Sequence, residues 1–335
     1  MNKRPTLSDV AKLADVSKAT AARVVNKTSD KVRPETRDRV LMAVQKLGYE
    51  PDEVARSLRS KRTYTIAVSI PDITQPFWPL VVRGIQDTAE AAGYRIVLMN
   101  SDWDTAREEL QVRQMRHKRF DGLIISPTTT QNTDLLKLSV PVVLLASGES
   151  FPDFDTVGSD SVQAARLAME HLIELNHRRI GLLTGPTRRR KAHTHRDTYI
   201  RELKSFHIPF DPSLVIETPF SYEGGIAGME QLLALGNRPT AVFAANDMIA
   251  LGALCAAERA GLRVPEQMSI IGMDDIFAAS TTCPPLTTVA KPRYDMGVTA
   301  ARFLFERIAD TPIADARHPL IPCKLVLRST THQPA

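Results

Sequence analysis

Apolar residues in the stretch 6–26, TLSDVAKLADVSKATAARVVN, recur at intervals of three and four, with one break at Asp15 and Val16. This spacing predicts two short amphipathic helices joined by a tight turn. Thr6 and Ser17 stand at the start of the two stripes, where a hydroxyl can cap the free backbone amides of a helix. Any small helical hairpin shows such a pattern, and so does a helix-turn-helix that enters the major groove of DNA.

A third helix is predicted after a polar loop. Pro34 fits the first position of that helix, and Gly48 fits the left-handed residue that ends it. The three helices can share one small apolar core, formed by Val10, Val16, Val24, Val40, Val44 and Leu47. A short segment rich in Arg and Lys, DEVARSLRSKRT at 52–63, comes next, and its Leu58 has no evident core to enter. Leu58 fits either a wedge in the minor groove of DNA or a linker helix packed on the next domain.

From Thr65 onward, apolar runs alternate with helical segments. The runs are 66–70, 95–100, 122–126, 141–146, 179–185, 240–245 and 268–272, and the helical segments are 80–92, 105–118, 162–176, 197–206, 224–235 and 248–260. Continuous β-rich runs that alternate with helices predict parallel sheets covered on both faces. Because these runs exceed what one minimal sheet requires, we expect two doubly wound subdomains. A ligand cleft is expected between them, outside the carboxyl ends of the strands.

The positive charge of the chain is concentrated near its N-terminus. The chain has 335 residues, of which 43% are hydrophobic and 24% charged, which is enough material for two or three globular domains. Residues 1–62 hold 15 Lys/Arg against 8 Asp/Glu, a net charge of +7, whereas the remainder has a net charge of −2. Localised positive charge is what neutralising DNA phosphates requires. A solvated basic tail would lack the helical stripes, so the two features together favour DNA binding.

Several other functions lack their sequence signals. No run of about 18 apolar residues occurs, and the N-terminus has no apolar signal segment, so we expect a cytoplasmic protein without a membrane partner. Cys255, Cys283 and Cys323 have no metal-ligand spacing, and the common nucleophile, phosphate-loop, dinucleotide and zinc motifs are absent. We therefore expect no metal, no cofactor and no catalytic residue. An enzyme, an exported solute-binding protein and a non-specific nucleoid protein are the rival classes.

Polar residues follow several of the predicted strands. They are Asp72, Ser147, Asn246 with Asp247, and Asp274 with Asp275. Because the carboxyl ends of parallel strands meet at one edge of a sheet, these side chains could converge on the hydroxyls of a polar ligand. Each of them also fits the N-cap of the following helix, and the residues alone do not decide between these roles.

These segments resemble the lactose-repressor/galactose-repressor (LacI/GalR) family of bacterial transcription factors along nearly the whole chain. The matching stretches are TLSDVAKLADVSKATAARVVN, VRPETRDRVLMAVQKLGY, the hinge pattern at 51–59, IPDITQPFW, RFDGLIISP, HLIELNHRRIGLLTGP, RPTAVFAANDMIALGAL, GLRVPEQMSIIGMDD and PPLTTV. The resemblance implies a helix-turn-helix headpiece (1–50), a hinge helix (51–62) and a core similar to periplasmic sugar-binding proteins (63–335). It also implies a homodimer on a pseudo-palindromic operator.

In that core the chain is expected to cross between the subdomains near residues 160, 290 and 323. Subdomain one then comprises 63–160 and 291–322, and subdomain two comprises 161–290 and 323–335.

By the same resemblance, Lys18, Ala19 and Arg23 occupy the base-reading positions of the recognition helix. The other residues that match DNA-contacting positions are Thr6, Ser17, Thr20, Asn26, Ala55 and Leu58, the last being the minor-groove wedge. Asp15 stands where the family usually has glycine. Because aspartate tolerates a left-handed backbone, the turn is expected to persist.

The residues that match the effector cleft of the family are Phe77, Asp160, Arg196, Phe220, Asn246, Asp247 and Asp274. Aromatic rings can stack on a sugar or a base, and arginine with aspartate can hold hydroxyls or a carboxylate. Each residue also has a structural alternative, such as core packing for the two phenylalanines. The basic run RRRKAHTHR at 188–196 is unusual for the family. It suggests an anionic effector, or else only a solvated loop.

The sequence therefore predicts a sequence-specific DNA-binding transcriptional repressor that is not an enzyme. Its operator affinity is expected to depend on a small polar metabolite, a sugar or a sugar acid, bound in the core cleft. Its partners would be double-stranded DNA, this effector and a second copy of the chain. The alternative is a metabolite-binding protein or enzyme of the same core fold with an accessory DNA-binding module. Whether the effector induces or co-represses is left open.

Overall fold

The computed structural model describes residues 5–25, 32–49, 62–115, 120–128, 130–186, 190–309 and 315–334. The chain divides into two compact units, Met1–Tyr64 and Thr65–Ala335, which we call the headpiece and the core. The headpiece contains α1 (Leu7–Leu13), α2 (Lys18–Val25) and α3 (Pro34–Leu47). Each unit is described by itself.

The three helices of the headpiece begin and end as their sequence predicts. Thr6 forms a complete capping box with Asp9 at the start of α1, and Gly48 ends α3 with a left-handed φ of 59°. Asp15 adopts a φ of 51° in the turn, which confirms that aspartate can replace glycine there. The helices share a small core in which Val10 and Val40 are fully buried, as expected.

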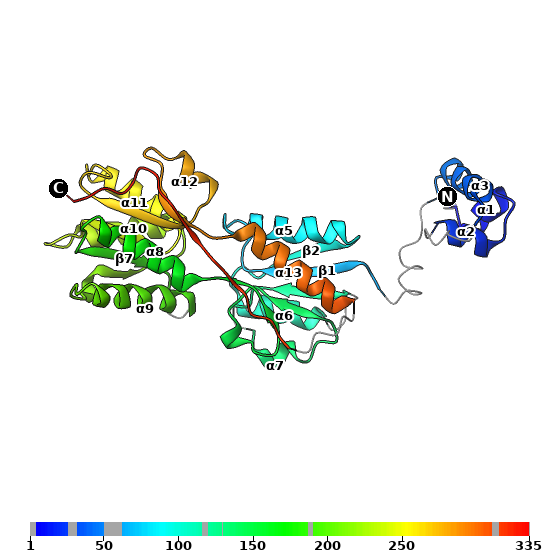
Figure 1. Ribbon diagram of the computed structural model, residues 1–335, viewed down its shortest axis with the longest axis horizontal. Helices are drawn as coiled ribbons and strands as arrows, with labels where there is room; N and C mark the ends of the chain where they lie inside the picture. Colours follow the sequence, from blue (N-terminus) through cyan, green and yellow to red (C-terminus); the bar gives the residue numbers. More distant parts are fainter. Residues whose placement is uncertain are drawn as a thin grey trace. The chain divides into compact units, whose positions relative to one another are not determined.

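The described part of the core contains two large sheets, each with helices on both faces (Figure 1), and one two-stranded sheet. The five-stranded sheet has the order β2-β1-β3-β4-β5 and is entirely parallel, and we call it with its helices lobe one. Its strands are β1 (Thr65–Ile70), β2 (Arg95–Asn100), β3 (Gly122–Ile125), β4 (Val142–Leu144) and β5 (Asp155–Thr156). Its helices are α5 (Trp78–Ala91), α6 (Thr105–Met115), α7 (Asn132–Leu135) and α13 (Arg293–Ile308).

The six-stranded sheet, with the order β13-β11-β10-β9-β7-β8, forms lobe two, and only its edge strand β13 is antiparallel. Its strands are β7 (Ile180–Thr184), β8 (Val215–Glu217), β9 (Ala241–Ala244), β10 (Ser269–Asp274), β11 (Thr287–Ala290) and β13 (Lys324–Val326). Its helices are α8 (Ser161–Glu174), α9 (Arg190–Ser205), α10 (Tyr222–Leu233), α11 (Asp247–Arg259) and α12 (Phe277–Thr281).

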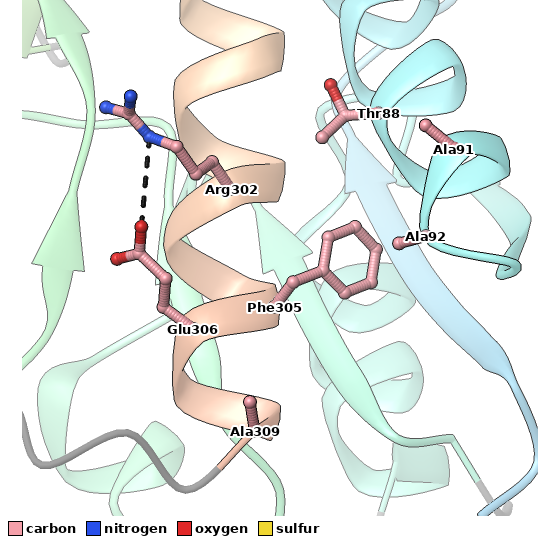
Figure 2. A pocket seen from close by; sticks show the side chains of 7 residues that line it. All are labelled: Thr88, Ala91, Ala92, Arg302, Phe305, Glu306 and Ala309. Atoms are coloured by element: carbon pink, nitrogen blue, oxygen red, sulfur yellow. Dashed lines mark ion pairs between the residues drawn. The ribbon is translucent and has the colours of Figure 1, made fainter.

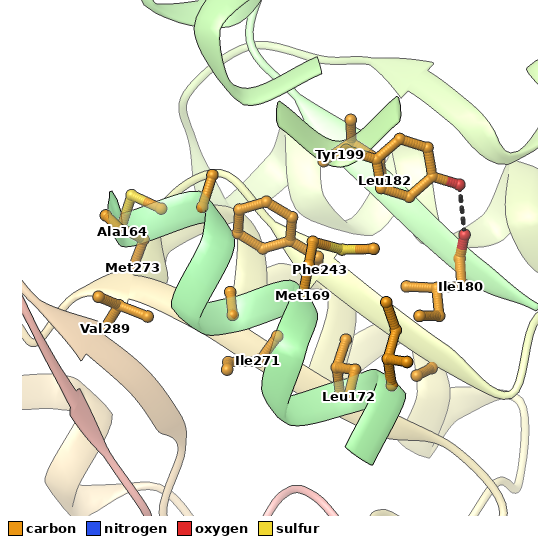
Figure 3. Packing of buried hydrophobic residues seen from close by; sticks show 14 of the residues in the cluster. Ala164, Met169, Leu172, Ile180, Leu182, Tyr199, Phe243, Ile271, Met273 and Val289 are labelled. Carbon is orange, nitrogen blue, oxygen red and sulfur yellow. Dashed lines mark hydrogen bonds between the residues drawn. The ribbon is translucent and has the colours of Figure 1, made fainter. Parts of the chain in front are cut away.

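Lobe two shows why its strands are continuously apolar. Neighbouring residues of a strand point to opposite faces of the sheet, and here both faces are covered. Phe243 joins the layer beneath α8 and α9, whereas Val242 joins the layer beneath α10 and α11. Figure 3 shows the first of these layers, in which Tyr199 donates a hydrogen bond of 2.8 Å to the carbonyl oxygen of Ile180. The buried hydroxyl of Tyr199 is therefore satisfied without water.

In lobe one, α5 and α13 pack closely through two glycines. A side chain on Gly84 would collide with the backbone of Tyr294, and one on Gly297 would collide with the backbone of Val81. The hydroxyl of Tyr294 also donates to Asp87 at 3.0 Å. This contact fixes the start of α13 against α5, and so fixes the residues that lead into it.

The chain passes between the lobes three times. It does so after β6 (Gly158–Ser159), after β11, and after β12 (Leu320–Ile321), and β6 pairs with β12 as a separate parallel ribbon. The last segment of the chain then runs into lobe two (Figure 1). Each lobe is therefore built from stretches that are far apart in the sequence.

The structure departs from the expected arrangement in two ways. The run 95–100 forms β2 as predicted, but this edge strand is not covered on both faces, because Val97 and Leu98 are 40% and 37% exposed. The apolar pattern also did not predict α7, α12 and α13, nor the strands β5, β8, β11 and β13. None of the helices in the part of the chain that the structure describes is long and apolar enough to cross a membrane.

Candidate functional site

The recognition helix α2 separates its residues cleanly between two faces. Ala21 and Val24 pack into the headpiece core, with exposed fractions of 0% and 4%. Lys18, Ala19 and Arg23, the predicted base-reading residues, are all exposed on the same helix. A helix that buries one face and presents cations on the other is suited to lie in a DNA groove.

The predicted phosphate-contacting hydroxyls lie at the helix starts. Ser17 Oγ accepts a hydrogen bond from the backbone amide of Thr20 at 3.1 Å, and its hydroxyl lies 2.9 Å from that of Thr20. Thr6 is exposed and caps α1. Three further predicted DNA-contacting residues, Asn26, Ala55 and Leu58, lie outside the described residues.

In the core, four residues meet where the lobes join, and we call them the junction cluster: Phe77, Asp274, Lys291 and Arg293. Lys291 Nζ lies 2.9 Å from Asp274 Oδ1 and 5.7 Å from the centre of the Phe77 ring. Phe77 immediately precedes α5 of lobe one, whereas Asp274 and Lys291 stand at the carboxyl ends of β10 and β11 of lobe two. The cluster therefore occupies the strand edge where α/β folds bind ligands.

Arg293 bridges the two lobes directly. Its Nη1 donates to the carbonyl oxygen of Pro76 at 3.0 Å, and its Nη2 donates to the carbonyl oxygen of Asp275 at 2.6 Å. The residue is only 8% exposed, and its Nε has no hydrogen-bond partner among the described residues. Because Arg293 and Pro76 both belong to lobe one, a movement of lobe two against lobe one would change the bond to Asp275.

The loop after β10 holds a strained backbone. Asp274 and Asp275 have φ values of 114° and 56°, a region that costs non-glycine residues about 1–3 kcal/mol each. Asp247 supports this loop from behind, since its Oδ2 accepts from the amide of Ile276 at 2.9 Å and its Oδ1 accepts from the hydroxyl of Thr288 at 2.6 Å. Burial, together with the nearby charge of Asp274, raises the pKa of Asp247 to about 7.

The remaining predicted cleft residues have visible local roles. Asp160 caps α8 by accepting from the amide of Gln163 at 2.8 Å, and Asn246 caps α11 by accepting from the amide of Ile249 at 2.8 Å. The ring of Phe220 lies directly over Gly185, at the end of β7. Arg196 is half-buried on α9, with an Nε that has no hydrogen-bond partner in the described ranges. Of these four residues, Asp160 lies near the junction cluster, because its charge acts on the Cys323 thiol together with the charges of Lys291 and Asp274 and affects the pKa of that thiol.

Sequence reasoning missed Lys291 and Arg293. The signal was available, because the letters KPR at 291–293 follow the run TTVA, just as the predicted polar residues follow other strands. Thr287 and Thr288 made that run look too polar for a buried strand, although both are fully buried. With the strand unrecognised, its end was not searched.

A surface hollow of about 430 Å³ lies elsewhere, between α5 and α13 (Figure 2). Its lining is largely apolar, with Phe305 and three alanines, and its charged members Arg302 and Glu306 face each other at 4.0 Å. It contains none of the predicted effector residues. Groups of three or more potential metal-ligating side chains are also absent from the described ranges.

Comparison with known proteins decides the family. Residues 6–52 match the bacterial regulatory proteins of the lacI family, and residues 169–331 match a periplasmic binding protein-like domain. Catabolite control protein A of Priestia megaterium is 37% identical over 330 residues, which are 97% of this chain and 99% of that protein. The chain belongs to the LacI family.

Solved structures of LacI-family proteins agree with this assignment. The Lac repressor dimer bound to operator and the anti-inducer ONPF has a TM-score of 0.88 and 30% identity, over 98% of this chain and 100% of that one. A LacI-family regulator from Enterococcus faecium with bound ribose has a TM-score of 0.73 and 32% identity, over 80% and 99% of the two chains. The fold is therefore that of a LacI-type headpiece on a periplasmic-binding-protein-like core, and the protein is a transcription regulator rather than an enzyme.

Proposed function

We propose that this LacI-family regulator is a repressor that binds a pseudo-palindromic operator as a homodimer and responds to a small polar metabolite held between its lobes. The observation that carries the proposal is the separation of functions. A cationic helix face lies in a headpiece with a net charge of +7 in residues 1–62, and a cluster of buried charges lies at the junction of the core lobes. Because a regulator has to reach chromosomal DNA, we infer that the protein is cytoplasmic.

The dimer is supported by the exposed edge of lobe one. β2 is the last strand of its sheet and presents Val97 and Leu98 to solvent, while the nearby helix α5 exposes Leu80 by 43%. An apolar edge strand left open is a liability that a partner surface removes. The Lac repressor relative is a dimer on its operator. We infer that β2 and α5 form the contact between two copies of this chain.

Control by the metabolite requires that it bind the two arrangements of the lobes with different affinities. The contacts of Arg293 would differ between the two arrangements, because its guanidinium bonds to both lobes at once. We propose that the effector changes these bonds, alters the separation of the two hinge segments in the dimer, and so alters operator affinity. The residues predicted for the cleft, among them Phe77, Phe220, Arg196 and Asp274, would contact it.

The test is selection of operator DNA. Full-length protein is incubated with genomic fragments and with random duplex at about 0.15 M salt, where surface electrostatics is already partly screened. We expect enriched fragments to share a pseudo-palindrome and to bind at least about a thousandfold more tightly than random duplex. Equal affinity for all duplexes, with equal salt dependence, would instead identify a non-specific nucleoid protein.

A further inference from the structure

The two cations of the junction cluster are paired differently. Asp274 is paired with Lys291, and Asp275 is paired with Arg328 at 2.6 Å. Arg293 is bonded only to carbonyl oxygens, and within the described ranges it forms no ion pair. Asp247, which lies behind the cluster, is partly protonated near neutral pH because its pKa is raised to about 7. Arg293 is therefore the cation of the junction cluster that has no ion-pair partner among the described residues.

Burying an uncompensated charge is costly, and structures usually supply a partner. Arg293 is 8% exposed, and its Nε points to no acceptor among the described residues. The side chain of Lys291 is 9% exposed. Arg293 is thus nearly removed from water, has no anionic partner among the described residues and keeps one unused donor beside the Lys291–Asp274 pair.

The helix starts at this position act in the same direction. The N-caps of α5 and α13 are Phe77 and Pro292, and neither provides a side-chain hydrogen bond to the first turn. The amides of Trp78 and Arg293 bond to the carbonyl oxygens of Gln75 and Lys291, but the start of a helix still carries a partial positive charge that favours anions. Both helices are long enough for this effect, with 14 and 16 residues.

We propose that the junction cluster binds the anionic group of the effector, a phosphate or a carboxylate, and that Lys291 and Arg293 determine this specificity. The inference rests on the proposed function and narrows its effector class. An oxyanion can accept from Arg293 Nε and from the Lys291 ammonium, which keeps its bond to Asp274. The Phe77 ring then covers the apolar side of the bound molecule. A neutral sugar leaves the Nε donor without an acceptor, and a site built for such a bond rejects a ligand that lacks it.

The probe for this proposal is inorganic phosphate, read by tryptophan fluorescence. The chain has two tryptophans, and the Trp78 ring lies 5.0 Å from that of Phe77. In full-length protein carrying Trp103→Phe, Trp78 becomes the single reporter beside the cluster. Phosphate is titrated against sodium chloride at constant ionic strength. D-gluconate, glucose 6-phosphate and glucose then distinguish a carboxylate, a phosphate and a neutral sugar.

We expect a saturable change of Trp78 emission with phosphate. Glucose 6-phosphate or gluconate is expected to bind at least tenfold more tightly than glucose.

Arg293→Gln, which can keep a donor towards Pro76 O or Asp275 O but removes the charge, is expected to weaken phosphate binding at least tenfold. Because Lys291→Gln alone can fail to fold, the double variant Asp274→Asn with Lys291→Gln is used, which removes the pair without leaving a charge. Lys137→Gln, which breaks the exposed pair of Lys137 with Asp134, is the matched control and is expected to bind as the parent does.

A second readout, thermal unfolding, needs no tryptophan substitution. An anion bound only to the folded state raises the thermal midpoint by mass action, and the junction variants are expected to lose that increment relative to the Lys137→Gln control. Three results would overturn the proposal. The first is the absence of saturable phosphate binding, and the second is that glucose binds as tightly as gluconate and glucose 6-phosphate. The third is that phosphate binding is unchanged in both junction variants. Operator selection separates the two levels. Specific operator binding that responds only to neutral sugars would contradict the anion site and leave the proposed regulatory function standing. Saturable anion binding by a protein that selects no operator would contradict the proposed function and leave the anion site standing.

Discussion

The ammonium of Lys291 lies 2.9 Å from Oδ1 of Asp274, and the two side chains are 9% and 8% exposed. The two residues stand at the ends of adjacent strands, β10 and β11, which pair in parallel. Their attraction therefore closes the strand edge at which the lobes meet. A buried pair of this kind is easily disrupted from one side, because the remaining partner becomes an unpaired buried charge.

Removal of either partner alone is expected to destabilise the core by about 3 kcal/mol. The double variant Asp274→Asn with Lys291→Gln is expected to cost less than the sum of the single changes, since it leaves no charge behind. Urea unfolding of the three variants measures this difference. Strict additivity would mean that the two groups do not interact.

Arg23→Ala tests the recognition helix. If Arg23 reads a base, the change costs about 1–3 kcal/mol on the selected operator and much less on random duplex, because only a base contact carries sequence information. Fluorescence anisotropy at several salt concentrations gives both affinities. Lys46→Ala, which removes one exposed cation from α3, is the charge-matched control. Equal losses on both duplexes would assign Arg23 to phosphate contact instead.

Asp155 makes lobe one sensitive to acid. Burial alone would raise its pKa, but hydrogen bonds from Arg307 and Arg317 outweigh burial and lower the pKa to about 2. A carboxyl with a depressed folded-state pKa stabilises the protein above its unfolded pKa, near 3.8, and loses that contribution as the pH falls towards 2. We expect about 2 kcal/mol to be lost over this range. Unfolding measured from pH 5 to pH 2 is expected to show a weaker acid dependence in Asp155→Asn, and identical profiles would contradict the assignment.

Val97→Asp tests the dimer contact. A carboxylate on the exposed edge of β2 would have to be desolvated between two copies of the chain, so the dimer is expected to dissociate at micromolar concentration. Analytical ultracentrifugation gives the mass. Leu110→Asp is the control, because Leu110 is 49% exposed on α6 rather than on β2. A Val97→Asp dimer as stable as that of the parent would place the contact elsewhere.

Gly297→Val tests the close approach of α13 to α5. Its side chain has no room beside the backbone of Val81, so the helices must separate, and we expect a loss of about 3 kcal/mol in the free energy of unfolding. Gly236→Ala is the comparison, since open space surrounds a Cβ at that position. It is expected to change stability by less than about 0.5 kcal/mol. Effects of equal size would show that packing does not explain the loss.

Strongly patterned segments were predictable from the sequence. Asp15 marked the turn between the first two helices, and Gly48 marked the end of the third. Both were predictable because few residues adopt a left-handed backbone. The buried parallel strands followed from their uninterrupted apolar runs. The same rule was wrong for the outer faces of β2, since an apolar run does not reveal that a strand lies at the edge of its sheet.

The junction cluster was only partly predictable. Asp274 was predicted from its place at a strand end as well as from family resemblance, and Phe77 from the resemblance alone, but the stretch with Lys291 and Arg293 resembles a solvated linker. Their burial depends on Pro76 and Asp275, which come from distant parts of the chain. Local pattern contains no information about such contacts.

The three crossings between the lobes have a consequence for synthesis. Lobe one needs α13, and lobe two needs β13 and the tail in which Thr330 donates to Ile270 O and its hydroxyl accepts from the amide of Thr287. Until α13 has left the ribosome lobe one cannot close its apolar interior, and until β13 and Thr330 have followed lobe two cannot close its own. Chaperone dependence is therefore expected to last until this shared segment, 293–330, has emerged, although most of both lobes has been synthesised by then.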